Sequence, residues 1–202
     1  MAASHLKLVA PNSDKRTTPK RGTNASYRTR EHLVAGEIER LLDATQCLRD
    51  RGMILVAFRH GLRASELCDL RWDQIDFAAA TMHVRRLKHG TEATHPIEGD
   101  ELRLLRRLQR ETASPSPFVF VSNRGAPFTR AGFARLVERA GVAAGLELKV
   151  HAHMLRHSCG FELARRGVDT RAIQGYLGHR CIEHTVAYTA LAPGRFANIW
   201  RD

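Results

Sequence analysis

The spacing of apolar residues along the chain predicts a mainly helical fold. After Glu31 the apolar residues recur on one side of a helix, as in an amphipathic helix; they are Leu33, Val34, Ile38, Leu41 and Leu42. A second helix is expected over residues 51–60, where an almost wholly apolar run indicates a buried helix that ends at Gly61. A short helix is expected over residues 65–70.

The middle of the chain changes to the two-residue period that is typical of a strand. Residues 81–87 alternate between apolar and polar side chains, with Met82, Val84 and Leu87 as the apolar set. Residues 88–90 (Lys-His-Gly) are a turn signal before a second extended run that ends at Ile97. Together with residues 76–77 in front, this predicts a small antiparallel sheet with Lys88 at the tip of a hairpin.

More helices are expected in the second half of the chain, over residues 100–111, 130–140, 153–166 and 169–177. Thr129 and Asp169 have the side chains of N-cap residues, and Gly167 and Gly178 lie where glycine commonly ends a helix. A short extended piece is expected at residues 118–121. The whole pattern predicts a mainly α fold with one small antiparallel sheet.

The composition of the chain indicates which class of partner the protein binds. The chain has 202 residues, enough for one domain with a real core, and a formal net charge of +11 at pH 7 that favours a polyanionic partner. The most apolar stretch, residues 52–58, is far shorter than a membrane-spanning helix, and no signal-type segment opens the chain. We therefore expect a cytoplasmic protein that binds nucleic acid rather than a membrane.

The cysteines and the N-terminal segment add two further expectations. The four cysteines are far apart and form no CxxC pair, so we expect no zinc site and small apolar core residues in the reduced state. Residues 11–30 are basic and polar with almost nothing apolar. We expect residues 1–30 to be a disordered basic arm, which either lies on phosphates or serves only as a solubilising tail.

Several residues supply the groups that a phosphodiester needs if it is cut without a metal: a nucleophile, cations around the non-bridging oxygens, and an acid for the leaving oxygen. The candidates are Tyr188 as nucleophile, Arg63, His153, Arg156 and His179 as cations, and Lys88 as acid. Each alone has a commoner explanation, such as a surface ion pair for Arg63 or a helix-end residue for His179. The complete set favours a catalytic site. The absence of a carboxylate cluster argues against metal-dependent nuclease chemistry.

Spacing suggests how some of these groups cooperate. His153 and Arg156 are three residues apart, so on a helix they project from one face and can converge on one anion. His157 is expected to face inward as a hydrogen-bonded support, and Glu66 to orient Arg63 or cap a helix.

The protonation states of two candidate side chains depend on the charges around them. His179 follows a helix C-terminus, where the helix dipole favours the protonated imidazole. Tyr188 has an ordinary pKa of about 10 and needs surrounding positive charge to reach a useful phenolate fraction, which we expect the four candidate cations to provide.

These segments resemble the tyrosine recombinase, or phage integrase, family over residues 31–189. The resemblance rests on the GLRxSEL block at residues 61–67, the hairpin lysine, HxLRH at residues 153–157, LGH at residues 177–179 and the closing tyrosine. Further runs resemble the short bacterial recombinases that invert the fimbrial promoter switch; they are residues 86–88, 94–96, 153–160, 169–171 and 184–186.

The resemblance implies a catalytic domain over residues 31–202, mainly α with a small three-stranded sheet, without a separate N-terminal clamp domain. It implies that Arg63, His153, Arg156 and His179 hold the scissile phosphate, that Lys88 protonates the leaving 5′-hydroxyl, and that Tyr188 forms a 3′-phosphotyrosine link. It implies no cofactor and no metal. The implied partners are double-stranded DNA and three further protomers in a tetramer on that DNA, with DNA-bending proteins as possible accessories and the nucleoid as location.

Three functions remain open from the sequence. The favoured one is site-specific recombination that inverts or integrates a DNA segment. A DNA-binding regulator without productive strand exchange would keep the fold, but it has no need for Tyr188. A type IB topoisomerase-like enzyme would share the chemistry and need no partner protomers.

Overall fold

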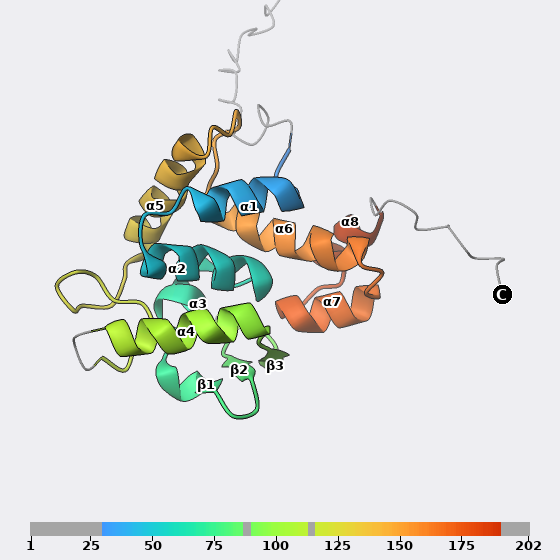
Figure 1. The fold of residues 1–202 in the computed structure, drawn as a ribbon. Helices are drawn as coiled ribbons and strands as arrows, with labels where there is room; N and C mark the ends of the chain where they lie inside the picture. Colours follow the sequence, from blue (N-terminus) through green and yellow to red (C-terminus); the bar gives the residue numbers. More distant parts are fainter. Residues whose placement is uncertain (1–29, 87–89, 113–115, 191–202) are drawn as a thin grey trace, which may run out of the picture.

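The computed structural model describes residues 30–86, 90–112 and 116–190, and in them the chain is mainly helical with one small antiparallel sheet, as predicted (Figure 1). The helices are α1 (Ala35–Asp43), α2 (Leu48–Arg59), α3 (Ala64–Cys68), α4 (Gly99–Glu111), α5 (Arg130–Ala143), α6 (Ala152–Arg165), α7 (Thr170–Leu177) and α8 (Glu183–Ala190). A 3-10 turn, η2 (Trp72–Gln74), leads into the sheet.

Helix α2 is the centre of the fold. Its residues 52–57 are all buried, and it packs against α1, α3, α4, α5 and α6 (Figure 1). This confirms the buried helix that the apolar run predicts. The middle of the helix is therefore fixed in the core, and its C-terminal end at Arg59 leads into the segment of residues 61–63.

The sheet consists of β1 (Ile75–Asp76), β2 (Thr81–Val84) and β3 (Ala93–Pro96), in that order and antiparallel throughout. Met82 faces His95 across β2 and β3, and Val84 faces Ala93. The hairpin that the alternation predicts is therefore present in the described residues. Residues 87–89, including Lys88, lie outside the described part of the chain.

Three of the predicted helix-end residues have the expected role. The Thr129 side chain accepts a hydrogen bond from the Gly132 backbone N–H at 3.0 Å and caps α5. Asp169 accepts two backbone N–H groups and caps α7. Gly178 ends α7 with a φ of 65°, a left-handed conformation that glycine adopts at little cost.

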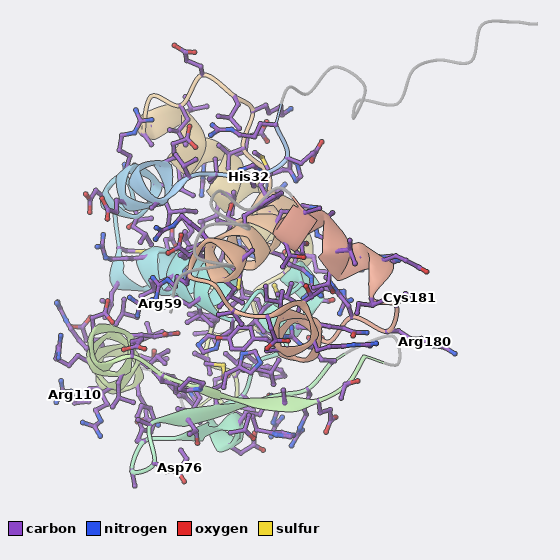
Figure 2. The ribbon with its side chains drawn as sticks, turned by 90° about the vertical axis from the view of Figure 1, so that its right-hand side faces the viewer. His32, Arg59, Asp76, Arg110, Arg180 and Cys181 are labelled. Atoms are coloured by element: carbon purple, nitrogen blue, oxygen red, sulfur yellow. The ribbon has the colours of Figure 1, made fainter. Side chains whose placement is uncertain are left out.

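Other details differ from the prediction. Helix α1 begins after Val34, which is 48% exposed, so the apolar side of the helix does not include this residue. Helix α8 was not predicted. Cys68 and Cys159 are buried as expected, whereas Cys47 and Cys181 are exposed, and Figure 2 shows Cys181 at the surface beyond α7. The expected arm falls almost wholly in residues 1–29, which lie outside the described part. The domain boundaries therefore stay a prediction.

Candidate active site

Arg63 lies where the chain turns from α2 into α3. Gly61 has a φ of 56°, and the turn that it permits makes Arg63 the N-cap residue of α3. Glu66 accepts a hydrogen bond from Arg63 Nη1 at 2.7 Å and another from the Arg63 backbone N–H at 3.0 Å. The carboxylate therefore fixes the direction of the Arg63 side chain, which remains partly exposed.

A second arginine, Arg86, reaches the same carboxylate from the hairpin. Its Nη1 donates to Glu66 Oε2 at 2.9 Å, and its Nη2 donates to the backbone carbonyls of His60 and Tyr176. Burial by itself raises the pKa of Glu66, but the Arg63 backbone N–H and the two guanidinium groups lower it below its ordinary value. Glu66 is therefore an ionised carboxylate between two cations.

Sequence reasoning missed Arg86. The signal was present: Met82 and Val84 face the core in β2, and the same two-residue period puts Arg86 on the inward side. An arginine at an inward position needs a buried acceptor, and Glu66 is the acidic residue that provides it.

Arg156 comes from α6 and is 2% exposed. Its Nη1 donates to the Gly61 carbonyl, and its Nη2 donates to the Leu177 carbonyl at 2.7 Å. It therefore joins the turn that carries Arg63 to the end of α7. Burial, followed by the positive charges of Arg63 and Arg86, lowers the pKa of Arg156 to about 10, so the group remains cationic at neutral pH. A bound anion would offset this repulsion between like charges.

His153 lies one turn before Arg156 on α6 and is exposed. Its ring meets the His157 ring edge-on, with the two centroids 4.5 Å apart. Partial burial of the ring, followed by His157 and Arg156, lowers the pKa of His153. The imidazole is therefore neutral at pH 7 in the DNA-free protein.

His179 follows Gly178 at the end of α7, and its Nδ1 forms a hydrogen bond of 2.9 Å with Thr185 Oγ1 of α8. Burial, followed by the charge of Arg156, lowers the pKa of His179 to about 3. The expectation that the helix dipole keeps this imidazole protonated is therefore wrong for the DNA-free protein. Burial beside several cations outweighs the dipole, whose effect is worth at most about 2 kcal/mol.

Tyr188 lies on α8 and is 3% exposed. Its hydroxyl oxygen is 2.9 Å from His157 Nδ1, and its ring packs edge-on against Phe161. Burial raises the pKa of Tyr188 above its ordinary value, and the opposing effect of Arg156 is smaller. The cations therefore do not produce a phenolate in the DNA-free protein, contrary to the expectation from sequence.

The structure brings most of the candidate residues to one place. Arg156 links the segments of Arg63 and His179, and the rings of His179 and Tyr188 are stacked with centroids 6.2 Å apart. Lys88 lies outside the described residues, and a Cβ added at Gly90, two residues after it in the sequence, would lie 3.0 Å from the Gly178 carbonyl oxygen. The described base of the hairpin therefore lies against the turn that precedes His179.

Comparison with known proteins gives the family of the chain. Residues 31–195 match the phage integrase family. The chain belongs to this family. It is a tyrosine recombinase, an enzyme that breaks and rejoins DNA strands. The type 1 fimbriae regulatory protein FimB of Escherichia coli K12 is 46% identical over 184 residues, which are 87% of this chain and 92% of FimB. Tyrosine recombinase XerA of Pyrococcus furiosus is 34% identical over 78% of this chain and 56% of that protein.

Solved structures show the same recombinase fold. The crystal structure of XerA recombinase superposes with a TM-score of 0.73 at 28% identity, over 82% of this chain and 62% of that one. XerH site-specific recombinase bound to its difH substrate has a TM-score of 0.69 at 24% identity, over 86% of this chain and 53% of that one. Among the residues that the structure describes, no helix is long and apolar enough to cross a membrane.

Proposed function

We propose that this recombinase cuts DNA by attack of Tyr188 on the scissile phosphate and rejoins strands from the resulting 3′-phosphotyrosine link. One observation carries the proposal. The buried Arg156 guanidinium binds the Gly61 and Leu177 carbonyls, and its positive charge acts on the Tyr188 hydroxyl. The single negative charge of a phosphodiester is shared by its two non-bridging oxygens, and a cation beside the attacking phenol can stabilise the charge that develops there.

Each side chain has a distinct role in this proposal. Arg63 and Arg156 bind the non-bridging oxygens, because guanidinium groups can grip a phosphate bidentately. His153 and His179 join them as hydrogen-bond donors. Both are neutral before DNA binds, and the negative charge of the phosphate raises the pKa of a neighbouring imidazole. Lys88 donates the proton to the leaving 5′-oxygen.

We propose that the biological reaction is inversion of a DNA segment. Integration of a DNA segment is the second candidate, because it uses the same strand cleavage and rejoining. The support is the 46% identity to FimB across nearly all of both chains. XerH and lambda integrase have been solved on their DNA sites, and we propose double-stranded DNA as the partner here too. We further propose a tetramer on paired sites, accessory DNA-bending proteins, and a cytoplasmic location at the nucleoid.

A nicked suicide substrate tests the proposal, because cleavage on it cannot be reversed and the covalent complex accumulates. Wild-type protein should give a protein–DNA adduct on a denaturing gel. Tyr188→Phe should give none while still binding DNA. Tyr176→Phe is the matched control, since its hydroxyl donates only to the Arg59 carbonyl among the described residues, and it should still form adduct.

The same substrate separates the proposed function from its alternatives. A regulator that only binds DNA would give no adduct with the wild-type protein. A topoisomerase-like enzyme would give adduct and relax a supercoiled plasmid that lacks any paired recombination sites. An undiminished adduct with Tyr188→Phe would show that Tyr188 is not the nucleophile.

A further inference from the structure

Four arginines form one exposed side of α4, away from the proposed catalytic site. They are spaced at i, i+3, i+4 and i+7, so they project from the same side of the helix. This basic stripe consists of Arg103, Arg106, Arg107 and Arg110. All four are exposed, whereas Glu101, Leu105 and Leu108 on the other side of α4 are buried in the core. At 1.5 Å per residue, the basic stripe covers about 10 Å of helix.

Little negative charge on the protein balances the basic stripe. Arg107 pairs with Glu111 at 2.7 Å, where both side chains are more than half exposed, and Arg106 donates to a backbone carbonyl. Arg103 and Arg110 form no ion pair with any residue that the structure describes. Like charges three and four residues apart on a helix repel each other. The helix dipole favours a cation in the last turn, such as Arg110, but it does not explain Arg103.

The basic stripe lies on the opposite side of the molecule from the catalytic site. Figure 2 shows Arg110 at one edge of the molecule and Arg180, which follows His179, at the other. Helix α4 packs against α2, whereas the candidate catalytic residues that the structure describes come from the α2–α3 turn, α6, the end of α7 and α8. Duplex DNA has a persistence length of about 150 bp. A duplex of about 20 bp at the catalytic site is therefore too stiff to reach the basic stripe as well.

The chemistry of this surface favours phosphates over a membrane or an acidic protein. The large exposed hydrophobic residues of the described chain are Val34, Val142 and Val186, and none of them is on α4. The buried Leu105 and Leu108 belong to the core, so α4 has no apolar side free to enter a bilayer. The basic stripe also lacks the apolar centre that is typical of a protein interface. Guanidinium groups can grip phosphates bidentately, and one DNA strand presents about three phosphates along 10 Å of its axis.

We propose that the basic stripe of α4 binds duplex DNA outside the recombination site, which rests on the proposed binding of the recombining duplex at the catalytic site. The contacts are to phosphates, so this binding is independent of base sequence. A protomer then holds two segments of DNA on opposite sides. Flanking DNA that loops back is retained beside the recombining duplex.

Photo-cross-linking tests the proposal without knowledge of the recombination site. The photoreactive residue benzoylphenylalanine replaces Arg107, and the protein also carries Tyr188→Phe so that no strand is cleaved. On irradiation, a labelled duplex of about 20 bp and arbitrary sequence should cross-link to this protein. A protein with the same photoreactive residue at Arg165, an exposed arginine at the end of α6, should cross-link far less.

Substitutions show which charges hold the cross-linked duplex. In the protein with the photoreactive residue at position 107, Arg103→Gln with Arg110→Gln should lower the yield by about one to two orders of magnitude at about 0.1 M salt, because two phosphate contacts are lost. Arg165→Gln with Arg166→Gln is the matched control: it removes the same charge from another exposed helix end and should leave the yield unchanged. Arg63→Gln, which weakens the proposed catalytic site, should also leave it unchanged.

Three results would overturn the proposal. An equal loss in the two double variants would show that only net charge matters. A loss with Arg63→Gln as large as that with Arg103→Gln and Arg110→Gln would place α4 on the path of the recombining duplex. Displacement of the labelled duplex by polyglutamate as readily as by unlabelled DNA would indicate an acidic protein as the partner. The adduct on the suicide substrate is measured separately, so its absence would count against the proposed function and not against DNA binding by α4.

Discussion

Arg86 donates to Glu66 at 2.9 Å in the interior of the protein, where the two side chains are 0% and 1% exposed. The same carboxylate accepts from Arg63, a residue of the proposed phosphate site. Arg86 also donates to the carbonyl of Tyr176, close to the end of α7. One buried ion pair thus connects the base of the hairpin, the α2–α3 turn and the turn before His179.

Arg86→Met should therefore destabilise the protein strongly. The substitution removes one of the two guanidinium groups that bind the buried Glu66 carboxylate, and breaking a buried pair costs about 3–5 kcal/mol. Urea unfolding followed by circular dichroism measures the loss. The control is Arg107→Met, which breaks the exposed Arg107–Glu111 pair of α4 and should cost less than about 1 kcal/mol. Similar losses for the two variants would contradict a structural role for the buried pair.

Gly160→Ala should slow cleavage by displacing the tyrosine. A Cβ at this position would meet Tyr188 ring carbons at 2.6 and 2.7 Å, closer than van der Waals contact allows, so the ring must shift. A displacement of about 1 Å in a reacting group can reduce the rate about a hundredfold. Suicide-substrate kinetics measure the effect, and a mobility shift should show unchanged DNA binding.

Gly175→Ala is the matched control for this substitution. It is also a glycine inside a helix, but nothing lies within 4 Å of its added Cβ. It should leave cleavage unchanged and stabilise the protein by up to about 1 kcal/mol, since alanine favours the helix. If both alanine variants cleave at the wild-type rate, the ring of Tyr188 is not held by Gly160.

The fold could be predicted largely because local patterns agree with tertiary packing. The apolar run in α2 requires burial on all sides, and the alternation in β2 requires a sheet with one covered face. Helix α8 was missed because its residues, from Glu183 to Ala190, mix polar and apolar positions without a clear helical side. Its position depends on contacts with α6 and α7 that the local sequence does not reveal.

The protonation states could not be predicted from sequence. Gly178 marks the C-terminal end of α7 in the sequence, so the effect of the helix dipole on His179 can be predicted. The burial of His179 cannot, because it depends on how α6, α7 and α8 pack together. The same holds for Tyr188, whose neighbours Gly160 and Phe161 come from α6. Burial, rather than local charge, decides the pKa of both groups.

A buried histidine pair predicts how stability depends on pH. His95 Nδ1 lies 3.1 Å from His60 Nδ1, and the other nitrogen of His60 lies 2.9 Å from Glu101 Oε1. The ring of His95 stacks on Tyr176 with centroids 3.7 Å apart. Burial, followed by the neighbouring His60 and Arg86, lowers the pKa of His95 from 6.5 to about 3.

Because the folded protein disfavours the protonated His95, stability is greatest above pH 6.5 and is lost as the pH falls toward 3. One such group changes the free energy of unfolding by about 1.4 kcal/mol per pH unit in this window. His95→Gln should flatten the profile measured by urea unfolding. His83→Gln, at an exposed residue of β2, should not. A profile with the wild-type slope in His95→Gln would disprove this assignment.

The role of Lys88 as the acid can be tested by changing the leaving group. Replacing the bridging 5′-oxygen by sulfur gives a group that leaves with little protonation, and proton donation is worth about two to four orders of magnitude in rate. Lys88→Ala should therefore be slow on the normal strand and fast on the sulfur-substituted strand. Arg156→Ala should stay slow on both, because its charge acts on the non-bridging oxygens. If Lys88→Ala has the same defect on both strands, Lys88 contacts the phosphate and another group protonates the leaving oxygen.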